Sequence, residues 1–482
     1  MESNWQEIQL SEFVSHQKGF AFKSKDYIDS GVPVVRVSNF TNDSIDISDF
    51  KFVSQSIAND RLSYELFEND VIVATVGSWP TNPASVVGKV VRVPSNATPS
   101  LLNQNAVILR PITDEKLDKV FLFYLLKDKD FSEYIVSTAQ GSANQASITL
   151  KDIYAYRFYL PHKEDRKMIA KILKRLDDKI TLNRKINQTL EQMAQTLFKS
   201  WFVDFDPVVD NALDAGFFER DLAFSDELLR RAEARKALRA SSAYLEQHKP
   251  LPKAIRQLFP AAFEKCAEPT LGHGGWVPKG WVTARLSDIA SLQNQSVHPN
   301  NEPDKIWRHY SLPAFDNGKM PSNDKGDTIK SGKFKAPKTC VLVSKLNPAT
   351  KRVWLPAIHD DIYSVCSTEF MPFVPRVGEH RQFLYCMLSS DGFQRNICSK
   401  VTGTTGSHQR VKPKEISTMA VLLPGSVLIE KLSQAVAPHF EKIQQSLLEN
   451  QYLENIRNIL LSKLISGELR LDQIEAELAE KK

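Results

Sequence analysis

Asn187-Gln-Thr-Leu-Glu191 recurs 263 residues later as Asn450-Gln-Tyr-Leu-Glu454, and the apolar positions on both sides of this stretch recur at the same shift. A second correspondence, at a shift of 276, relates Trp5-Gln-Glu-Ile-Gln-Leu10 to Trp281-Val-Thr-Ala-Arg-Leu286. A collinear series of matches indicates an internal duplication. The chain is therefore predicted to contain two copies of one structural unit.

The second part of each copy is predicted to be a long helix. Apolar side chains recur at steps of three and four residues from Ile169 to Trp201, and on the same phase from Leu432 to Leu464. Each heptad stripe needs a partner, and we expect the two stripes to pair with each other. The alternative is two separate amphipathic helices, each packed on its own domain. The predicted seam residues are Leu173, Ile180, Asn187, Leu190, Leu197, Val436, Ile443, Asn450, Leu453 and Leu460.

Two details refine the helical part. Asn187 and Asn450 fall on corresponding seam positions, where a buried amide lowers stability but can fix register. Pro438 is expected to begin the second long helix, because proline is tolerated in a first helical turn. A helix of about 25 to 30 residues, rising about 1.5 Å per residue, would span roughly 40 Å.

The first part of each copy is predicted to be rich in strands, so the fold class is α+β. Runs of β-branched residues bounded by Gly, Pro, Asn and Ser predict strands. One short helix is expected near Phe121–Leu126. The predicted strands lie within residues 32–37, 70–75, 86–93 and 340–344.

Residues 206–275 separate the two copies and are predicted to be a connector. Ser225 is a good capping residue and is followed by acidic residues, so a helix is expected from there to about Gln247. Pro250, Pro252 and the glycine-rich residues 272–275 are typical of a connecting segment.

The composition is that of an ordinary globular protein, with 42% hydrophobic and 25% charged residues. The N-terminus is polar and no window holds 18 consecutive apolar residues, so we expect neither a secretory signal nor a membrane anchor. Five irregularly spaced cysteines predict no disulfide framework and fit a reducing cytoplasm.

The net charge of +5 is too small to establish nucleic-acid binding, but its distribution is informative. Residues 71–110 contain no acid and include Lys89, Arg92 and Arg110. Residues 329–354 also contain no acid. Two such stretches favour two anion-facing surfaces, although a merely solvated basic face is the alternative. The basic residues of the second stretch are Lys330, Lys333, Lys335, Lys338, Lys345, Lys351 and Arg352.

The motifs of several enzyme classes are missing. The sequence holds no phosphate-binding loop, no dinucleotide fingerprint and no histidine pattern with metal-ligand spacing. Asn347-Pro-Ala-Thr350 lacks the second proline and the aromatic residue of the motif that holds a base in amino-methyltransferases. We therefore expect no catalytic residues, no metal site and no cofactor in this chain.

The order of β-rich unit, helix, connector, β-rich unit and helix resembles the specificity subunit of type I restriction-modification systems. The resemblance covers nearly the whole chain. The stretches that carry it are residues 169–180, 187–202, Pro278-Lys-Gly-Trp281, Val343-Ser-Lys-Leu-Asn-Pro348 and residues 461–470.

The resemblance implies that each β-rich unit reads one half of a split, asymmetric sequence in double-stranded DNA. The helical regions would form an antiparallel spacer that docks two methyltransferase subunits, and a translocase-endonuclease subunit would join that core. Adenine methylation and ATP-dependent cleavage would belong to these partners. The implied divisions are target-recognition domain 1 (1–161), first spacer (162–205), connector (206–275), target-recognition domain 2 (276–424), and second spacer with the C-terminal tail (425–482).

The resemblance does not identify the residues that read DNA, so side-chain chemistry has to choose them. Arg, Lys, Asn, Gln and His on loops can meet base edges or phosphates. The polar loops before Ile153 and Ile416 occupy corresponding places in the two copies. Each choice has a structural or surface-polar role as its alternative. The candidates are Arg36, Asn39, Trp79, Asn144, Gln145, Arg308, His309, Lys333, Lys345, Asn347, Arg352, His408, Gln409 and Arg410.

Two other functions compete with this interpretation. One is a self-contained methyltransferase-nuclease, which would bind S-adenosylmethionine without partners. The other is a coiled-coil scaffold that joins proteins and does not read a DNA sequence. Selective DNA binding by the assembled complex would separate the specificity subunit from the scaffold.

Overall fold

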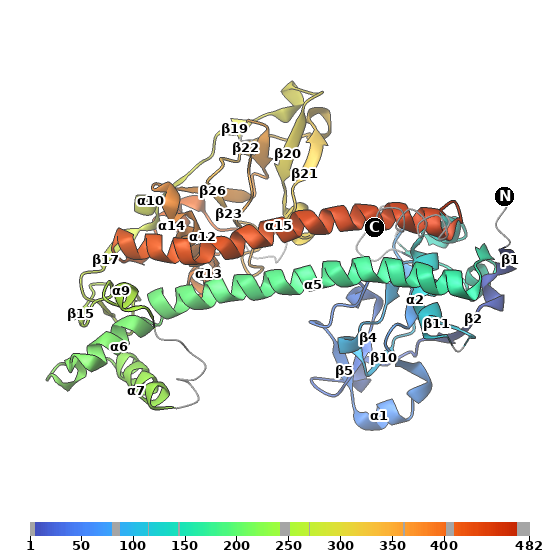
Figure 1. Cartoon of the computed structure of the whole chain (residues 1–482), viewed down its shortest axis with the longest axis horizontal. Coiled ribbons are helices and arrows are strands. Elements are labelled where there is room, and N and C mark those ends of the chain that lie inside the picture. Colours follow the sequence, from blue (N-terminus) through green and yellow to red (C-terminus); the bar gives the residue numbers. More distant parts are fainter. Residues whose placement is uncertain are drawn as a thin grey trace, which may run out of the picture. The chain divides into compact units, whose positions relative to one another are not determined.

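The computed structural model describes residues 5–79, 87–113, 115–142, 145–241, 251–268, 270–359, 362–401 and 409–469. The chain divides into two compact units. Unit 1 comprises residues 1–182 and 450–482, and unit 2 comprises residues 183–449. Each unit contains one β domain and one half of each of two long helices (Figure 1). Within the described ranges, no helix is both long enough and apolar enough to cross a membrane.

The first β domain runs from β1 to β14 and contains a four-stranded sheet of order β2-β11-β7-β9 and a five-stranded sheet of order β3-β5-β4-β10-β6. Two smaller sheets pair β1 with β14 and order β12-β13-β8. Its helices are α1 (Gln55–Asn59), α2 (Lys116–Lys127), α3 (Lys129–Ser137) and α4 (Leu150–Tyr154). Its strands are β1 (Gln6–Gln9), β2 (Val14–Lys18), β3 (Tyr27–Ile28), β4 (Val32–Val35), β5 (Lys51–Val53), β6 (Glu65–Leu66), β7 (Val71–Ala74), β8 (Val76–Gly77), β9 (Val90–Arg92), β10 (Ser100–Leu102), β11 (Ala106–Pro111), β12 (Gln140–Ser142), β13 (Gln145–Ser147) and β14 (Arg157–Leu160).

The second β domain runs from β17 to β27 and repeats this plan, with sheets of order β18-β26-β23-β24 and β19-β22-β25-β20-β21. Its helices are α10 (Leu286–Ile289), α11 (Leu312–Asp316), α12 (Arg381–Ser389), α13 (Asp391–Ser399) and α14 (Pro413–Ser417). Its strands are β17 (Val282–Arg285), β18 (Ala290–Leu292), β19 (Ser296–Val297), β20 (Ile306–Tyr310), β21 (Ser322–Lys325), β22 (Lys333–Lys335), β23 (Val341–Ser344), β24 (Val353–Trp354), β25 (Ser364–Cys366), β26 (Phe370–Pro375) and β27 (Ala420–Leu423).

Strand pairing confirms the duplication seen in the sequence. In the first domain β1 pairs antiparallel with β14, and Gln6 lies opposite Leu160. In the second domain β17 pairs antiparallel with β27, and Val282 lies opposite Leu423. The first strand of each copy is therefore closed by the last, immediately before the long helix begins.

The long helices α5 (Lys163–Phe202) and α15 (Ser426–Ile465) are 40 residues each, and their starts differ by the predicted shift. In unit 1 Asp177 accepts a bond from Arg457, and in unit 2 Asn183 donates to Glu449 at 2.8 Å. Later residues of α5 therefore meet earlier residues of α15, so the helices pair as an antiparallel coiled coil.

The helices are longer than the 25 to 30 residues expected from the heptad pattern. Their extra turns pack on the β domains rather than along the seam: in unit 1 Ile169 and Ala170 join the core of the first domain. In unit 2 Trp201 and Phe202 join the core that contains α12. The heptad pattern thus detects the seam but underestimates the helices.

Most predicted seam positions are buried or nearly so. Leu190 and Leu197 are partly buried against the core of unit 2, and Leu460 against that of unit 1. Leu453 is half-buried. The fully buried seam residues are Leu173, Ile180, Asn187, Val436, Ile443 and Asn450.

The expectation for Pro438 is wrong, because α15 begins at Ser426 and the proline lies inside it. A proline inside a helix removes one main-chain hydrogen bond and costs about 3 kcal/mol. The preceding turns bury Leu428, Ile429, Leu432 and Val436 in the core of unit 2. Burial of a large aliphatic side chain contributes about 1.5–3 kcal/mol, so four of them outweigh the proline.

The described residues of the connector are folded and belong to unit 2. They contain α6 (Asp206–Asp214), α7 (Asp226–Ala240), α9 (Lys253–Arg256) and β15 (Phe263–Lys265), which pairs with β16 (Trp276–Pro278) just after the connector. Ser225 caps α7 as predicted, by accepting a hydrogen bond from the Leu228 amide. Phe205, Phe217 and Phe263 join the same apolar core as the second β domain.

Candidate nucleic-acid interface

In each β domain two loops are joined by hydrogen bonds. We call residues 75–89, between β7 and β9, hairpin loop 1, and residues 138–149 polar loop 1. The Trp79 Nε1 atom donates to the Ser142 carbonyl at 2.8 Å, and the Ile148 amide donates to the Thr75 carbonyl at 2.9 Å. Strand β13, which contains the exposed Gln145, pairs with β8 of the hairpin loop.

The second β domain repeats this junction. Hairpin loop 2 is residues 345–352, between β23 and β24, and polar loop 2 is residues 400–412. The Asn347 amide donates to the Gln409 carbonyl at 2.9 Å, and the Val411 amide donates to the Lys345 carbonyl at 3.1 Å. The structure therefore brings together candidates that lie about 60 residues apart in the sequence.

A third segment, the turn after β4, holds two of the sequence candidates in structural roles. The Asn39 side chain is only 2% exposed. Its Oδ1 accepts from the Arg36 amide, and its Nδ2 donates to the Asp49 carbonyl. The Arg36 guanidinium also donates to Asp49. In this conformation Asn39 holds the turn instead of facing solvent.

Two arginines of the second domain are paired with carboxylates. Arg352 donates through Nε and Nη2 to the two carboxylate oxygens of Asp316, at 2.7 and 2.9 Å, and its side chain is 15% exposed. Arg410 makes a similar fork with Glu369 at 3.1 and 3.2 Å but remains 45% exposed. The hydrogen-bonded Glu369 carboxylate raises the pKa of Arg410 above its usual value. Of the two, Arg410 is the more accessible.

The candidates of the five-stranded sheet in the second domain are partly withdrawn from solvent. His309 Nδ1 lies 2.9 Å from Asp324 Oδ2, and burial lowers the pKa of His309 despite this carboxylate. Lys333 is buried, its ammonium donates to Ser331, and burial lowers its pKa too. Arg308 is half-buried on the same strand as His309.

The remaining candidates divide by accessibility. Lys345 is half-buried. Asn347 has a positive φ of 46°, and its buried Oδ1 has no hydrogen-bond partner among the described residues. Gln409 is half-buried. Asn144 and His408 lie outside the described residues.

The first acid-free stretch contains three cations. Two of them interact with a carboxylate or an aromatic ring of the same domain. Arg110 donates to the buried Asp70 through Nε and Nη2. The Arg92 guanidinium carbon lies 5.0 Å from the centre of the Phe123 ring. Lys89 differs, because among the described residues its ammonium donates only to the Phe40 carbonyl, at 3.2 Å.

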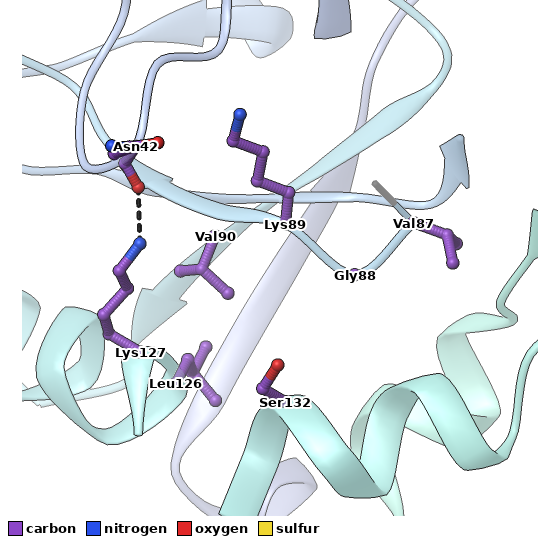
Figure 2. Close-up of a pocket in the computed structure, with 8 residues that line it drawn as sticks. All are labelled: Asn42, Val87, Gly88, Lys89, Val90, Leu126, Lys127 and Ser132. Carbon is purple, nitrogen blue, oxygen red and sulfur yellow. Dashed lines mark hydrogen bonds between the residues drawn. The ribbon is translucent and has the colours of Figure 1, made fainter. Parts of the chain in front are cut away.

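Lys89 lines a cavity of about 350 Å³ that the sequence candidates did not include. Figure 2 shows the Lys127 ammonium reaching Asn42, with Val90 and Lys89 beside it. The acid-free stretch was the one signal that pointed to Lys89. Lys127 and Asn42 lie far from it in the sequence, so only the fold places them together. The cavity is lined by Asn42, Val87, Gly88, Lys89, Val90, Leu126, Lys127 and Ser132.

Among the residues that the structure describes, no group of three or more His, Cys, Asp or Glu side chains could hold a metal ion. Burial raises the pKa of the Cys340 thiol to about 12 and that of Cys366 well above its ordinary value, so neither thiol is activated.

The chain thus contains two duplicated β domains, each with a pair of joined polar loops and each attached to an antiparallel helix pair. Residues 2–192 match the family model described as the type I restriction modification DNA specificity domain. The type I restriction enzyme HindI specificity subunit of Haemophilus influenzae is 26% identical over 380 residues, which cover 72% of this chain and 77% of that protein.

The MjaIX specificity subunit of Methanocaldococcus jannaschii is 25% identical over 373 residues, which cover 73% of this chain and 70% of that protein. A type I restriction-modification S subunit from M. genitalium has the same fold, with a TM-score of 0.50, 14% identity and 96% of both chains covered. The chain is therefore similar to type I restriction-modification specificity subunits.

Proposed function

We propose that this chain is the DNA sequence-specificity subunit of a type I restriction-modification complex, with each β domain reading one half of a split target. The observation that carries the proposal is the junction of a hairpin loop with a polar loop, repeated at equivalent positions in both domains. Loops on rigid scaffolds are where binding residues concentrate. Methylation and cleavage belong to the partner subunits.

The experiment that tests this function is a map of methylated adenines in a genome with and without the gene. A split motif that loses methylation when the gene is removed supports the proposal. A scaffold without sequence readout would leave no motif tied to this chain. Binding of S-adenosylmethionine by the purified chain would favour the self-contained methyltransferase.

We expect direct base contacts from polar side chains of the joined loops, one in each β domain. Gln145 and Gln409 can each make two hydrogen bonds to adenine in the major groove. Changing either to alanine should relax one position of one half-site and cost about 1–3 kcal/mol of binding. The measurement is a binding series with single base changes. Selectivity that is unchanged in both variants would remove these residues from the interface.

The helix pair is proposed to set the number of unread base pairs between the half-sites. Adding one heptad to both α5 and α15 lengthens each by about 10 Å, which corresponds to about three base pairs. Methylation mapping of this variant should show a longer spacer and unchanged half-sites. A changed half-site with the same spacer would contradict the ruler.

An exposed apolar stripe on α15 supports docking of a methyltransferase subunit. Tyr452, Ile456 and Ile459 recur at helical spacing on one face and are 69%, 47% and 60% exposed. Exposed apolar patches of this kind mark interaction sites. Changing Ile456 and Ile459 to glutamate should abolish co-purification with the methyltransferase, whereas Gln451→Glu, on the same helix, should not. Assembly that survives the double change would remove this stripe as the docking site.

A further inference from the structure

The cavity beside Lys89 in the first β domain carries a positive charge that the domain does not balance. Its polar lining is Asn42, Lys89, Lys127 and Ser132. The Lys89 ammonium has no carboxylate partner among the described residues and donates only to a carbonyl. The Ser132 side chain is exposed and its hydroxyl makes no hydrogen bond there. Two ammonium groups and one free hydroxyl are donors suited to an anion.

The carboxylate of Asp43, next to Asn42 of the cavity, is shared between two cations. The Lys127 Nζ atom lies 2.9 Å from Oδ1 of Asp43, and the Arg457 Nη1 atom of α15 lies 3.2 Å from Oδ2. Burial alone would raise the pKa of Asp43, but Lys127 and Arg457 hold it below its usual value. Burial and the charge of Lys127 lower the pKa of Lys89, more than Asp43 raises it. The ammonium groups of Lys89 and Lys127 therefore repel each other across the cavity.

The local backbone fixes this arrangement. Gly88 has a positive φ of 77°, and a Cβ atom there would lie 2.7 Å from a methyl group of Ile135 in α3. Only glycine lets the end of hairpin loop 1 approach α3 so closely. Lys89 follows Gly88 directly, and it lines the same cavity as Ser132 of the first turn of α3.

We propose that this cavity binds a phosphate group through Lys89, Lys127 and Ser132. An incoming phosphate offers Lys127 a second anion, so it competes with Asp43 for that ammonium. The group belongs either to a DNA backbone or to phosphate free in solution. Hairpin loop 1 ends at the cavity, so a duplex read by this loop would bring its backbone here; this source rests on the proposed function.

The first arm of the test uses inorganic phosphate and the full chain. Phosphate should raise the thermal midpoint of the wild type above that in chloride at equal ionic strength. Lys89→Gln should weaken the binding of phosphate at least tenfold. Ser132→Asp, at an exposed position that tolerates the change, should do the same by placing a carboxylate in the cavity. The matched control is Lys129→Gln, because Lys129 carries the same charge nearby but is solvent-exposed and pairs with Glu133.

The second arm measures how DNA binding depends on salt. Loss of one phosphate contact reduces the slope of log K against log salt by about one, equally for target and scrambled duplexes. If Lys89→Gln changes both arms, the cavity holds a backbone phosphate; if it changes the first arm alone, the cavity holds free phosphate. The proposal is overturned if Lys89→Gln and Ser132→Asp match Lys129→Gln in both arms. Failure of the proposed function would show differently, as wild-type protein that binds target and scrambled duplexes equally.

Discussion

The two β domains share one scaffold but use equivalent cations differently. In the second domain Arg352, which directly precedes β24, is held by both carboxylate oxygens of Asp316. In the first domain the residue before β9 is Lys89, and the nearby Asp43 is occupied by Lys127. The same backbone thus presents a compensated arginine in one copy and an open cationic cavity in the other. Equivalent positions in a duplicated fold have roles that their tertiary neighbours decide.

The largest expected effect comes from a buried ion pair that only the first copy has. Arg166 of α5 donates twice to Asp118 at 2.9 Å, and the position corresponding to Arg166 in α15 is the buried Ile429. Arg166→Ile leaves the Asp118 carboxylate buried without its arginine and should destabilise unit 1 by about 3–5 kcal/mol. Hydrogen exchange of α2 amides in the full chain measures this loss. The double variant Arg166→Ile/Asp118→Leu should recover most of it, and a harmless single variant would contradict the prediction.

A tyrosine in each domain donates to a carboxylate of α5, and removing either hydroxyl tests whether the units are energetically separate. Tyr124 bonds to Asp177 and Tyr385 bonds to Glu191. A hydrogen bond to a charged group contributes about 1.5–3 kcal/mol. Tyr124→Phe should raise hydrogen exchange in unit 1 alone, and Tyr385→Phe in unit 2 alone. Equal changes in both units for either variant would refute the division.

The same tyrosines predict a dependence on pH. Burial, followed by the partner carboxylate, raises the pKa of both phenols above the ordinary value of 10. The neutral phenol is the form that the folded state favours. Its contribution is therefore complete below pH 10 and is lost as the pH rises above it. Tyr124→Phe and Tyr385→Phe have no phenol to ionise. Each variant should therefore lose less stability above pH 10 than the wild type, as measured by hydrogen exchange over a pH series.

In the helix seam of unit 2, one substitution is expected to increase stability. Asn187 is 9% exposed, and within the part of the chain that the structure describes neither Oδ1 nor Nδ2 has a hydrogen-bond partner, whereas Asn183 bonds to Glu449. A buried unsatisfied polar group costs about 1–3 kcal/mol. Asn187→Leu should therefore stabilise unit 2 by about that amount, and Asn183→Leu should destabilise it. Thermal unfolding of the full chain provides the comparison, and a loss of stability in Asn187→Leu would be the contrary result.

The smallest expected effect comes from removing the carboxylate that pairs with Arg352. Asp316 is 47% exposed, so Asp316→Asn should change stability by about 0–1 kcal/mol. It should also free Arg352 for an anion and steepen the salt dependence of DNA binding by about one phosphate contact. Asp327→Asn removes the same charge without freeing an arginine and is the control. Identical slopes in the two variants would show that Arg352 does not face DNA when released.

Local patterns predicted much of the scaffold. The β-branched runs located β4, β7, β9 and β23 to within a few residues, because alternation and turn residues act locally. The heptad pattern located both long helices for the same reason. It could not give their full length, since their outer turns pack on β domains whose positions the sequence does not reveal.

The candidate site was harder to predict from the sequence. Which cations are paired with carboxylates depends on contacts between residues that lie far apart in the chain. Arg110 and Arg352 are separated from Asp70 and Asp316 by 40 and 36 residues, so neither pairing follows from the local pattern. Asn39 has a side chain typical of base contacts but is used to hold its own turn. The cavity beside Lys89 depends on three segments that only the folded chain brings together.

The proline inside α15 has a mechanical consequence. Pro438 corresponds to Arg175 in α5, which has no interior proline, so the duplicated helices are not equally stiff. The carbonyl of Gln434 lacks the amide donor that a continuous helix would supply, and both residues face solvent. Bending is easiest at such a point. We therefore expect α15 to bend more easily at residues 434–438 than α5 does at the corresponding turn.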